Sequence, residues 1–240
     1  NGTIVAPEEA RVSVFDRGVL YGDSVYEVVR TYKGVPLELE DHLDRLESSA
    51  ARIGMRLAAD RETFAREVLQ THAASENEES YLRIVSTRGS GTLGLDPALA
   101  EHPLRLVIAL PLTLPPPEVY AGAKLALVSA RRNLSTAIDP MAKTGNYLNS
   151  VMALAEARTR GAYEAVMLDH RDYVTEGASS NIFIVLGDTL LTPPLDAGIL
   201  EGITRKVVMR VAERAGLRVL QLNLSSQALE KADEVFITSS

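Results

Sequence analysis

The chain contains no cysteine, which excludes a disulfide framework, a thiolate nucleophile and a cysteine-bound metal ion. It also lacks any apolar run that approaches the roughly 20 residues of a transmembrane helix. Its first residues do not form the pattern of a signal peptide. From these absences we expect a cytoplasmic protein.

Basic residues are fewer than acidic residues. Lys and Arg together number 25 against 32 Asp and Glu, so the formal net charge is −7 at pH 7. An acidic surface repels the phosphates of nucleic acids and gives no sign of an anionic membrane partner. We therefore expect neither a nucleic acid nor a membrane among the partners.

The 240 residues, of which 46% are hydrophobic, are enough for one large or two small globular domains. Both ends look cut: Asn1-Gly2 is a turn that normally joins two strands, and Ser240 directly follows a strand-like run. We expect a first strand and a C-terminal segment to be missing from this chain.

Proline punctuates the sequence most clearly at residues 112–118, where three consecutive prolines favour an extended linker. This predicts a small N-terminal α/β domain at 1–111 and a large domain at 119–240. Strand-like and helix-like segments alternate without a regular βαβ rhythm, which predicts an α/β (α+β) fold with antiparallel or mixed sheets.

The helices are predicted from periodicity and caps. Four longer helices are expected at about 41–53, 61–73, 146–160 and 204–215, and a short helix is expected between RVLQLNL and EVFITSS. Asp41 is the expected N-cap of the first helix, and Gly216 is the expected C′ residue of the helix at 204–215.

Two motifs point to functions that we reject. Residues 89–94 satisfy the G-x-G-x-x-G pattern of dinucleotide-binding loops, but Asp96-Pro97 follows where a helix would have to begin. A loop is the better interpretation, although a nucleotide-linked oxidoreductase stays open as an alternative. The histidines lie at no metal-ligand spacing, so no metal site is predicted, and His42 is best explained by helix packing or a hydrogen bond.

Three segments carry chemistry of another kind. Lys143 is a potential amine nucleophile in a turn-prone stretch before a helix, and Glu176 ends a strand before several small residues. Gly202, Ile203 and Thr204 form a helix start whose free N–H groups and positive dipole suit a phosphate. Each also has an ordinary explanation: a solvated lysine, a surface glutamate or a simple helix cap.

Together these segments supply what pyridoxal 5′-phosphate requires. A lysine forms a Schiff base with its aldehyde, a carboxylate pairs with its pyridinium nitrogen, and a helix N-terminus holds its phosphate.

The order of the motifs resembles that of the fold-type IV pyridoxal-phosphate enzymes, the class IV aminotransferases. This family includes branched-chain amino-acid aminotransferases, D-amino-acid aminotransferases and aminodeoxychorismate lyase. The matching segments are DRGVLYGDSVYE (16–27), DHLDRLESSA (41–50), KTGNYLN (143–149), VTEGASSNIF (174–183), GILEGITR (198–205) and VFITSS (235–240). The resemblance implies a two-domain protein with the cofactor held by the large domain, and a homodimer or higher homo-oligomer.

The resemblance also implies roles for individual residues. Lys143 would carry the cofactor and move the substrate proton, and Glu176 would pair with the ring nitrogen. Tyr147 would bind the phenolic oxygen, and Tyr26 would line the substrate pocket. The remaining cofactor contacts would come from Arg45, Ser179, Leu200, Gly202, Ile203, Thr204, Ser239 and Ser240.

The substrates would be an amino acid and a 2-oxo acid such as 2-oxoglutarate. Segments 22–32 and 174–181 favour D-amino acids such as D-glutamate or D-alanine, whereas residues 81–83, residues 94–97 and Tyr147 favour branched-chain L-amino acids. Residues 90–94 lack the arginine and histidine that the D-alanine type uses to bind the carboxylate. Arginine suits that task because its planar fork binds carboxylates at two points; the candidates are Arg30, Arg83 and Arg88.

We interpret the chain as a transaminase and lean modestly to D-amino acids. A branched-chain L-amino-acid aminotransferase or an (R)-amine transaminase is the alternative. Aminodeoxychorismate lyase and a non-catalytic pyridoxal-phosphate-binding homologue are less favoured.

Overall fold

The computed structural model describes residues 1–240, which form two compact units. The first unit contains residues 1–114 and 142–146, and the second contains residues 115–141 and 147–240. The short segment around Lys143 therefore belongs to the N-terminal unit, although it follows the proline-rich stretch in the sequence. No sequence pattern signals this assignment.

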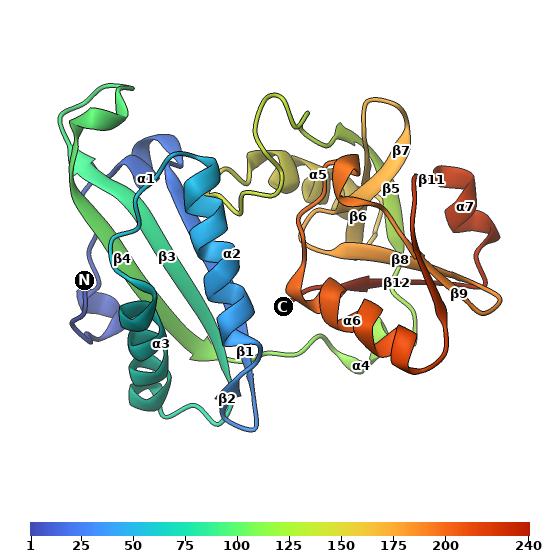
Figure 1. The fold of residues 1–240 in the computed structure, drawn as a ribbon, viewed down its shortest axis with the longest axis horizontal. Helices are drawn as coiled ribbons and strands as arrows, with labels where there is room; N and C mark the ends of the chain where they lie inside the picture. The colour runs from blue at the N-terminus through green and yellow to red at the C-terminus, as the bar shows by residue number, and fades with distance from the viewer. The chain divides into compact units, whose positions relative to one another are not determined.

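The first unit is built on one four-stranded antiparallel sheet in the order β2-β1-β3-β4. Helices α2 and α3 pack against it (Figure 1). Val25 and Val29 on β1 alternate inward with period two and meet Leu43 and Leu46, which recur at helical spacing on α2. The strands are β1 (Ser24–Tyr32), β2 (Val35–Pro36), β3 (Ser80–Gly91) and β4 (Ala100–Pro111), and the helices are η1 (Pro7–Glu9), α1 (Arg17–Tyr21), α2 (Leu39–Arg52), α3 (Arg61–Ser75) and η2 (Pro97–Leu99).

Two local predictions in this unit are wrong. Asp41 is not an N-cap: α2 begins at Leu39 after Glu38, which adopts a left-handed conformation with φ of 50°, so Asp41 lies in the first helical turn. There its negative charge still favours the helix N-terminus.

The second prediction is the loop at residues 89–94, the G-x-G-x-x-G run, and only part of it is a loop. Its first half, up to Gly91, continues β3 and pairs with β4. The carbonyls of Gly94, Leu95 and Asp96 accept hydrogen bonds from the Arg17 guanidinium. The expected loop is therefore wrong for residues 89–91, whereas the rejection of the dinucleotide interpretation is supported, because no α-helix begins after Gly94 and before β4.

The second unit contains two four-stranded mixed sheets, in the orders β11-β7-β6-β5 and β10-β9-β8-β12. The pairs β5/β6 and β9/β10 are parallel and the other pairs are antiparallel. The predicted α/β fold with antiparallel or mixed sheets is confirmed. The strands are β5 (Leu125–Arg131), β6 (Glu164–Leu168), β7 (Tyr173–Gly177), β8 (Asn181–Leu186), β9 (Thr189–Thr192), β10 (Arg218–Gln221), β11 (Leu224–Ser225) and β12 (Glu234–Thr238).

The helices of the second unit pack on these sheets. Ala153 and Ala157 of α5 are fully buried against β5 and β6, and α6 packs on β10. Gly216 has φ of 86° directly after α6, which confirms the predicted C′ position. The helices are α4 (Pro117–Ala121), α5 (Leu148–Thr159), η3 (Leu195–Ala197), α6 (Ile203–Arg214) and α7 (Ser226–Lys231).

The proline-rich stretch is only partly extended. Pro116 is extended, but Pro117 is the first residue of α4, a position that needs no backbone N–H and suits the fixed φ of proline.

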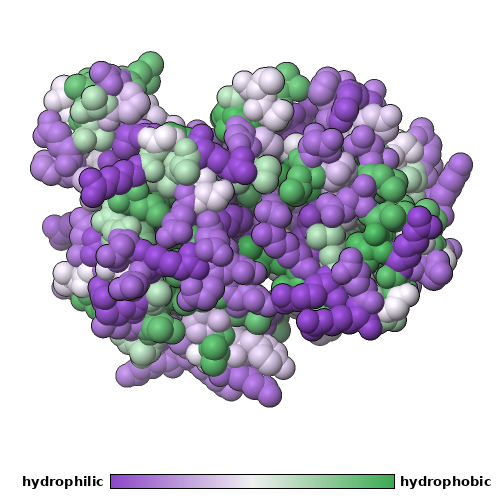
Figure 2. Space-filling model, in the orientation of Figure 1, coloured by the Kyte–Doolittle hydropathy of each residue, from purple (hydrophilic) through white to green (hydrophobic).

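Hydrophilic residues cover much of the face of the molecule that Figure 2 shows. None of the helices combines the length and the apolar character that crossing a membrane requires.

Candidate functional site

The Lys143 segment is held beside β1 by backbone hydrogen bonds. The Tyr26 amide donates to the Lys143 carbonyl at 3.0 Å, and the Gly145 amide donates to the Ser24 carbonyl at 2.9 Å. The Lys143 amide itself donates to Ser49 Oγ on α2 at 3.0 Å. A Cβ at Gly145 would lie 2.3 Å from Ser24 Oγ, so any other residue there would displace the Ser24 hydroxyl. These bonds fix the backbone from which the Lys143 side chain extends.

Two cations lie over one aromatic ring next to that backbone. Lys143 Nζ is 4.3 Å from the centroid of the Tyr26 ring, and the Arg83 guanidinium carbon is 3.9 Å from the same centroid. Both distances fall within cation–π range. The structure therefore brings together Lys143, Tyr26 and Arg83, three of the predicted site residues.

The three candidate arginines do not share one environment. Arg83 lies opposite Val28 on β1, and Arg30 lies opposite Tyr81, so both point to the same side of the sheet as Tyr26. Arg88 points to the other side, where it donates to Asp23 at 2.8 Å and to the carbonyls of residues 53 and 54. Its hydrogen bonds favour a structural role for Arg88 over substrate binding.

Arg45 belongs to a buried ionic cluster that the sequence did not reveal. Its Nε and Nη2 atoms each donate to a different oxygen of Glu27 at 2.7 Å, and His42 Nδ1 is 2.7 Å from Glu27 Oε2. Burial raises the pKa of Glu27, but the hydrogen bonds from Arg45 and His42 outweigh it and hold the pKa below the ordinary value. The expected hydrogen bond of His42 is thus present; the phosphate contact of Arg45 stays a prediction.

Glu176 is a buried carboxylate on β7 in the second unit. Its Oε2 atom accepts from the Leu200 amide at 2.9 Å and from Asn181 Nδ2 at 3.2 Å. Asn181 Nδ2 also donates to the Leu200 carbonyl at 3.0 Å. The contacts attach Glu176 to the segment that leads into α6.

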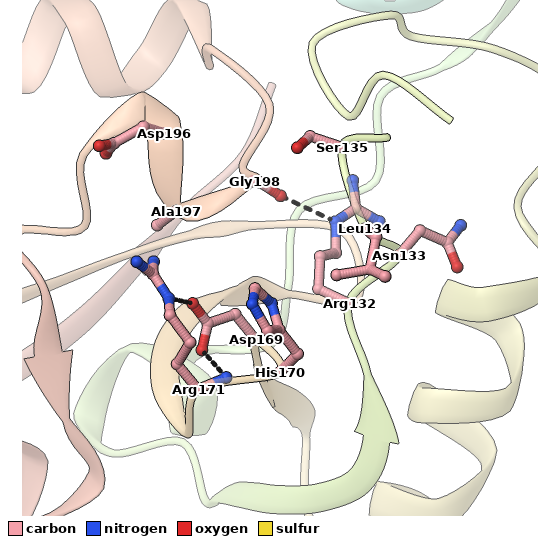
Figure 3. A pocket seen from close by; sticks show the side chains of 10 residues that line it. All are labelled: Arg132, Asn133, Leu134, Ser135, Asp169, His170, Arg171, Asp196, Ala197 and Gly198. Carbon is pink, nitrogen blue, oxygen red and sulfur yellow. Dashed lines mark hydrogen bonds and ion pairs between the residues drawn. The ribbon is translucent and has the colours of Figure 1, made fainter. Parts of the chain in front are cut away.

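Arg132 is the site residue that the sequence analysis missed. It directly follows β5, and its Nη2 atom lies 2.8 Å from Glu176 Oε1. Its Nε donates to the Gly198 carbonyl at 3.3 Å, as Figure 3 shows. The Arg131-Arg132 pair could have drawn attention, but no sequence spacing predicts that the second arginine meets a glutamate on another strand.

A cavity of about 150 Å³ adjoins the Arg132 side chain. It is lined by residues 132–135, 169–171 and 196–198, all in the second unit. In Figure 3 Arg171 and Asp169 form an ion pair on one side, at 2.9 Å, while Arg132 reaches toward Gly198 on another. Arg132 therefore contacts Glu176 and also lines the polar cavity.

The start of α6 has the features predicted for a phosphate site. Gly202 is the N-cap and has no side chain with which to cap the first N–H groups of the helix, which include those of Ile203 and Thr204. Thr204 Oγ1 is 3.3 Å from the Ser239 carbonyl and 3.4 Å from Ser240 Oγ. The structure therefore brings Thr204, Ser239 and Ser240 together at this helix end.

Gly202 also connects the helix start with Glu176. A Cβ at residue 202 would lie 2.0 Å from Asn181 Oδ1, the other end of the amide that donates to Glu176. A side chain there would displace Asn181. The absence of a Cβ is therefore a packing requirement of the site and not only a matter of backbone freedom.

The remaining predicted residues have other partners. The Ser179 hydroxyl donates to Glu164 Oε2 at 3.0 Å, which, with similar bonds from Ser180 and the Ala178 amide, organises the turn after β7. Tyr147 is the N-cap of α5, where its carbonyl accepts from the Val151 amide at 2.9 Å. Leu200 contributes its backbone to Glu176 as described above.

Each unit by itself carries groups that suit pyridoxal phosphate. The first unit supplies an amine on a fixed backbone, at Lys143. The second unit supplies a buried carboxylate at Glu176 and an uncapped helix N-terminus at residues 202–204. No group of three or more His, Asp or Glu side chains is arranged to hold a metal ion.

Comparison with known proteins gives consistent matches over nearly the whole chain. The sequence model of the family "Amino-transferase class IV" matches residues 24–240. A Methanocaldococcus jannaschii protein provisionally named branched-chain-amino-acid aminotransferase is 42% identical over 99% of this chain and 82% of its own length. A D-alanine aminotransferase from Bacillus licheniformis is 32% identical over 100% of this chain and 83% of its own.

Solved structures agree. A branched-chain amino acid aminotransferase of T.th., complexed with N-(5′-phosphopyridoxyl)-L-glutamate, superimposes with a TM-score of 0.93 and 32% sequence identity. The match covers 100% of this chain and 80% of that one.

Proposed function

Because this chain belongs to the class IV aminotransferases and is a pyridoxal-phosphate-dependent transaminase, we propose that it transfers the amino group of branched-chain L-amino acids to 2-oxoglutarate. The observation that carries the proposal is the grouping of Lys143 and Arg83 over the ring of Tyr26, beside the sheet of the first unit. The branched-chain enzymes among its relatives support the same substrate class.

The cofactor contacts proposed for the second unit follow from its hydrogen bonds. Glu176 binds the ring nitrogen, and the amides of Ile203 and Thr204 bind the phosphate with the Thr204 hydroxyl and the serines at 239 and 240. When bound, pyridoxal phosphate supplies an aldehyde for the amino group and a ring that accepts electrons from the substrate's Cα–H bond. Glu176 keeps a proton on the ring nitrogen and so favours that acceptance.

Lys143 has two proposed tasks. Its amine would hold the cofactor through the aldehyde, and, when free, the same amine would take the proton from the substrate Cα and later return it. This transfer is reversible, so a 2-oxo acid recovers the amino group along the same route. The hydrogen bonds to Tyr26 and Ser49 keep the lysine backbone in place for both tasks.

The face of the sheet around Lys143 offers both an apolar and a charged surface. Tyr26 and Val28 are buried and apolar, which suits an aliphatic side chain. Arg83, opposite Val28, suits the additional carboxylate of 2-oxoglutarate, with Arg30 as the second candidate. A site with both surfaces would bind an aliphatic amino acid and an acidic acceptor in turn.

D-amino acids such as D-glutamate or D-alanine are the second candidate substrates. The D-alanine aminotransferase among the relatives and the D-type motifs at 22–32 and 174–181 favour them. The two candidates differ in which face of the substrate Cα is presented to Lys143.

Lys143→Ala tests the catalytic assignment. Both turnover and the visible absorbance of the bound cofactor should be lost, because no other amine replaces the covalent link. Lys124→Ala is the matched control: this exposed lysine donates to the Arg160 carbonyl, away from the proposed site. Turnover and an unchanged spectrum in Lys143→Ala, with folded protein by circular dichroism, would refute the assignment.

Half-reactions of the purified protein decide between the substrate classes. The cofactor absorbance should bleach faster with L-leucine or L-isoleucine than with D-glutamate or D-alanine. Faster bleaching by the D-amino acids would move the enzyme to the D-amino-acid group.

We also propose a cytoplasmic homodimer or higher oligomer. Leu148, Val151 and Met152 form an exposed apolar stripe on α5, with exposed fractions of 70%, 57% and 59%. Such a stripe is suited to covering by a second copy of the chain. Analytical ultracentrifugation of wild type and of Val151→Glu tests this, because the charge should shift the protein toward monomer.

A further inference from the structure

Glu176 and Arg132 form a partly buried ion pair. The Glu176 and Arg132 side chains are only 8% and 15% exposed, and the Nη2 to Oε1 distance is 2.8 Å. The Leu200 amide and the Asn181 side chain, which also donate to the carboxylate, are neutral and bind Oε2. The guanidinium is therefore a positive charge placed on one oxygen while neutral donors hold the other.

A buried carboxylate stays ionised only where charge or hydrogen bonds replace water. Arg205, the other buried guanidinium of this unit, also interacts electrostatically with Glu176, but its hydrogen bonds go to the Pro193 carbonyl and to Gln221 Oε1, both at 2.9 Å. On the far side of Arg132, the cavity carries the Asp169–Arg171 pair, His170 and Asp196. Of the two arginines, Arg132 is the one whose guanidinium lies at contact distance from the carboxylate.

We propose that Arg132 is a positioning residue that keeps Glu176 ionised, so that the proton between Glu176 and the ring nitrogen of pyridoxal phosphate stays on the nitrogen. The inference rests on the proposed function, because it requires the cofactor ring to lie against Glu176. It goes beyond that function by assigning a role to an arginine outside the predicted site.

The physical reason is a competition between two bases for one proton. Beside Arg132, a neutral Glu176 would lose its attraction to the guanidinium, so the carboxylate form is favoured. Without Arg132, the proton would move from the ring nitrogen to Glu176, which would leave a neutral acid facing a neutral ring. No proton is gained or lost overall; only its location changes. The ring would then accept electrons less readily.

The test measures where the proton is. The bound cofactor, labelled with ¹⁵N at the ring nitrogen, is examined by NMR in wild type and in four variants. Arg132→Ala and Arg132→Gln should move the signal from the protonated to the unprotonated position. Arg132→Lys, which keeps the charge, should retain the protonated signal. Arg131→Ala is the matched control, because Arg131 is the adjacent, more exposed arginine that pairs with Asp172.

Chemical rescue separates charge from shape. Truncation in Arg132→Ala enlarges a cavity that already measures about 150 Å³, so a guanidinium ion can enter where the side chain was. At low, non-denaturing concentration guanidinium should restore the protonated signal, and urea, which has a similar shape without charge, should not. The half-reaction rate should fall about 10–100-fold in Arg132→Ala and recover with guanidinium alone.

The outcomes are distinct. A protonated ring nitrogen in Arg132→Ala and Arg132→Gln would overturn the inference, and so would equal rescue by urea. If wild type shows no bleaching with any amino acid, the proposed function fails instead. Should Arg132→Ala not fold, Arg132→Gln, whose amide can still donate to the Gly198 carbonyl, decides the question on the same NMR signal.

Discussion

Each unit of the molecule holds a buried glutamate on a strand, but the two are held differently. Glu27 in the first unit is completely inaccessible, and its carboxylate contacts both Arg45 and His42 at 2.7 Å. Glu176 in the second unit keeps 8% of its side chain exposed and pairs with Arg132, while neutral donors hold its second oxygen. The first carboxylate is enclosed in the fold, whereas the second can still meet a ligand.

This difference indicates how one residue type serves two purposes. The Glu27 carboxylate on β1 binds two side chains of α2, so it links the helix to the strand and contributes to the stability of the fold. A carboxylate fixed by one cation and two amide donors keeps its orientation without being covered. The comparison predicts opposite consequences for stability and catalysis when each glutamate is changed.

The largest effect on folding is expected for Glu27→Ala. It leaves the Arg45 guanidinium buried without its carboxylate, which costs roughly 3–5 kcal/mol of unfolding free energy. Urea unfolding followed by circular dichroism measures it. Glu40→Ala, which removes an exposed partner of Arg61, is the control and should cost about 1 kcal/mol or less. A loss below that of the control would show that the buried cluster does not stabilise the fold.

Glu176→Gln should affect catalysis instead. The amide cannot keep the ring nitrogen protonated, so kcat should fall about 100–1000-fold, the scale of losing one electrostatic group in an active site. The glutamine has one acceptor oxygen in place of two, so its NH2 group must face either Arg132 or the donors of Leu200 and Asn181. The unfolding free energy should therefore fall by about 1–3 kcal/mol, less than in Glu27→Ala. Steady-state kinetics and urea unfolding of the same preparation test both. Unchanged kcat would contradict the proposed role.

Gly202→Ala tests the connection between the helix start and Glu176. The new Cβ would press on Asn181 Oδ1, and the resulting strain of about 1–3 kcal/mol should weaken cofactor binding roughly tenfold or more. Fluorescence titration of the apoprotein with pyridoxal phosphate gives the affinity. Gly187→Ala is the control: its φ of 59° makes alanine costly, but nothing lies within 4 Å, so stability should fall while affinity is retained.

Acid should destabilise the first unit gradually. Hydrogen bonds from arginines hold the pKa values of Glu27 and Asp23 below their ordinary 4.5 and 3.8, against the opposing effect of burial. Their stabilisation is therefore complete above those ordinary values and is lost as pH falls through the lower folded-state pKa values. Urea midpoints between pH 6 and 3 should fall, and more shallowly in Glu27→Gln. Identical slopes would contradict the assignment to Glu27.

Much of the fold was predictable because its signals are local. The apolar spacing of α2, the Gly216 C′ position and the strand runs at 181–186 and 234–238 depend on neighbouring residues only. The Asp41 cap failed because a charged residue in the first turn of a helix looks like a cap when the left-handed Glu38 is not foreseen. Glu27 was overlooked, although a charge between Val25 and Val29 on the inward face of β1 is itself a signal that partners must exist.

The sequence by itself determined which chemical groups are present and in which order: a lysine before a helix, a glutamate before small residues, and a glycine at a helix start. It thereby determined the family, because these motifs are short and each is contiguous. Only the tertiary structure decided that residues 142–146 join the sheet of the first unit, that Arg45 meets Glu27 and that Arg132 meets Glu176. Such pairings depend on how strands are ordered in a sheet, and hydrogen bonds between distant residues leave no periodic pattern along the chain.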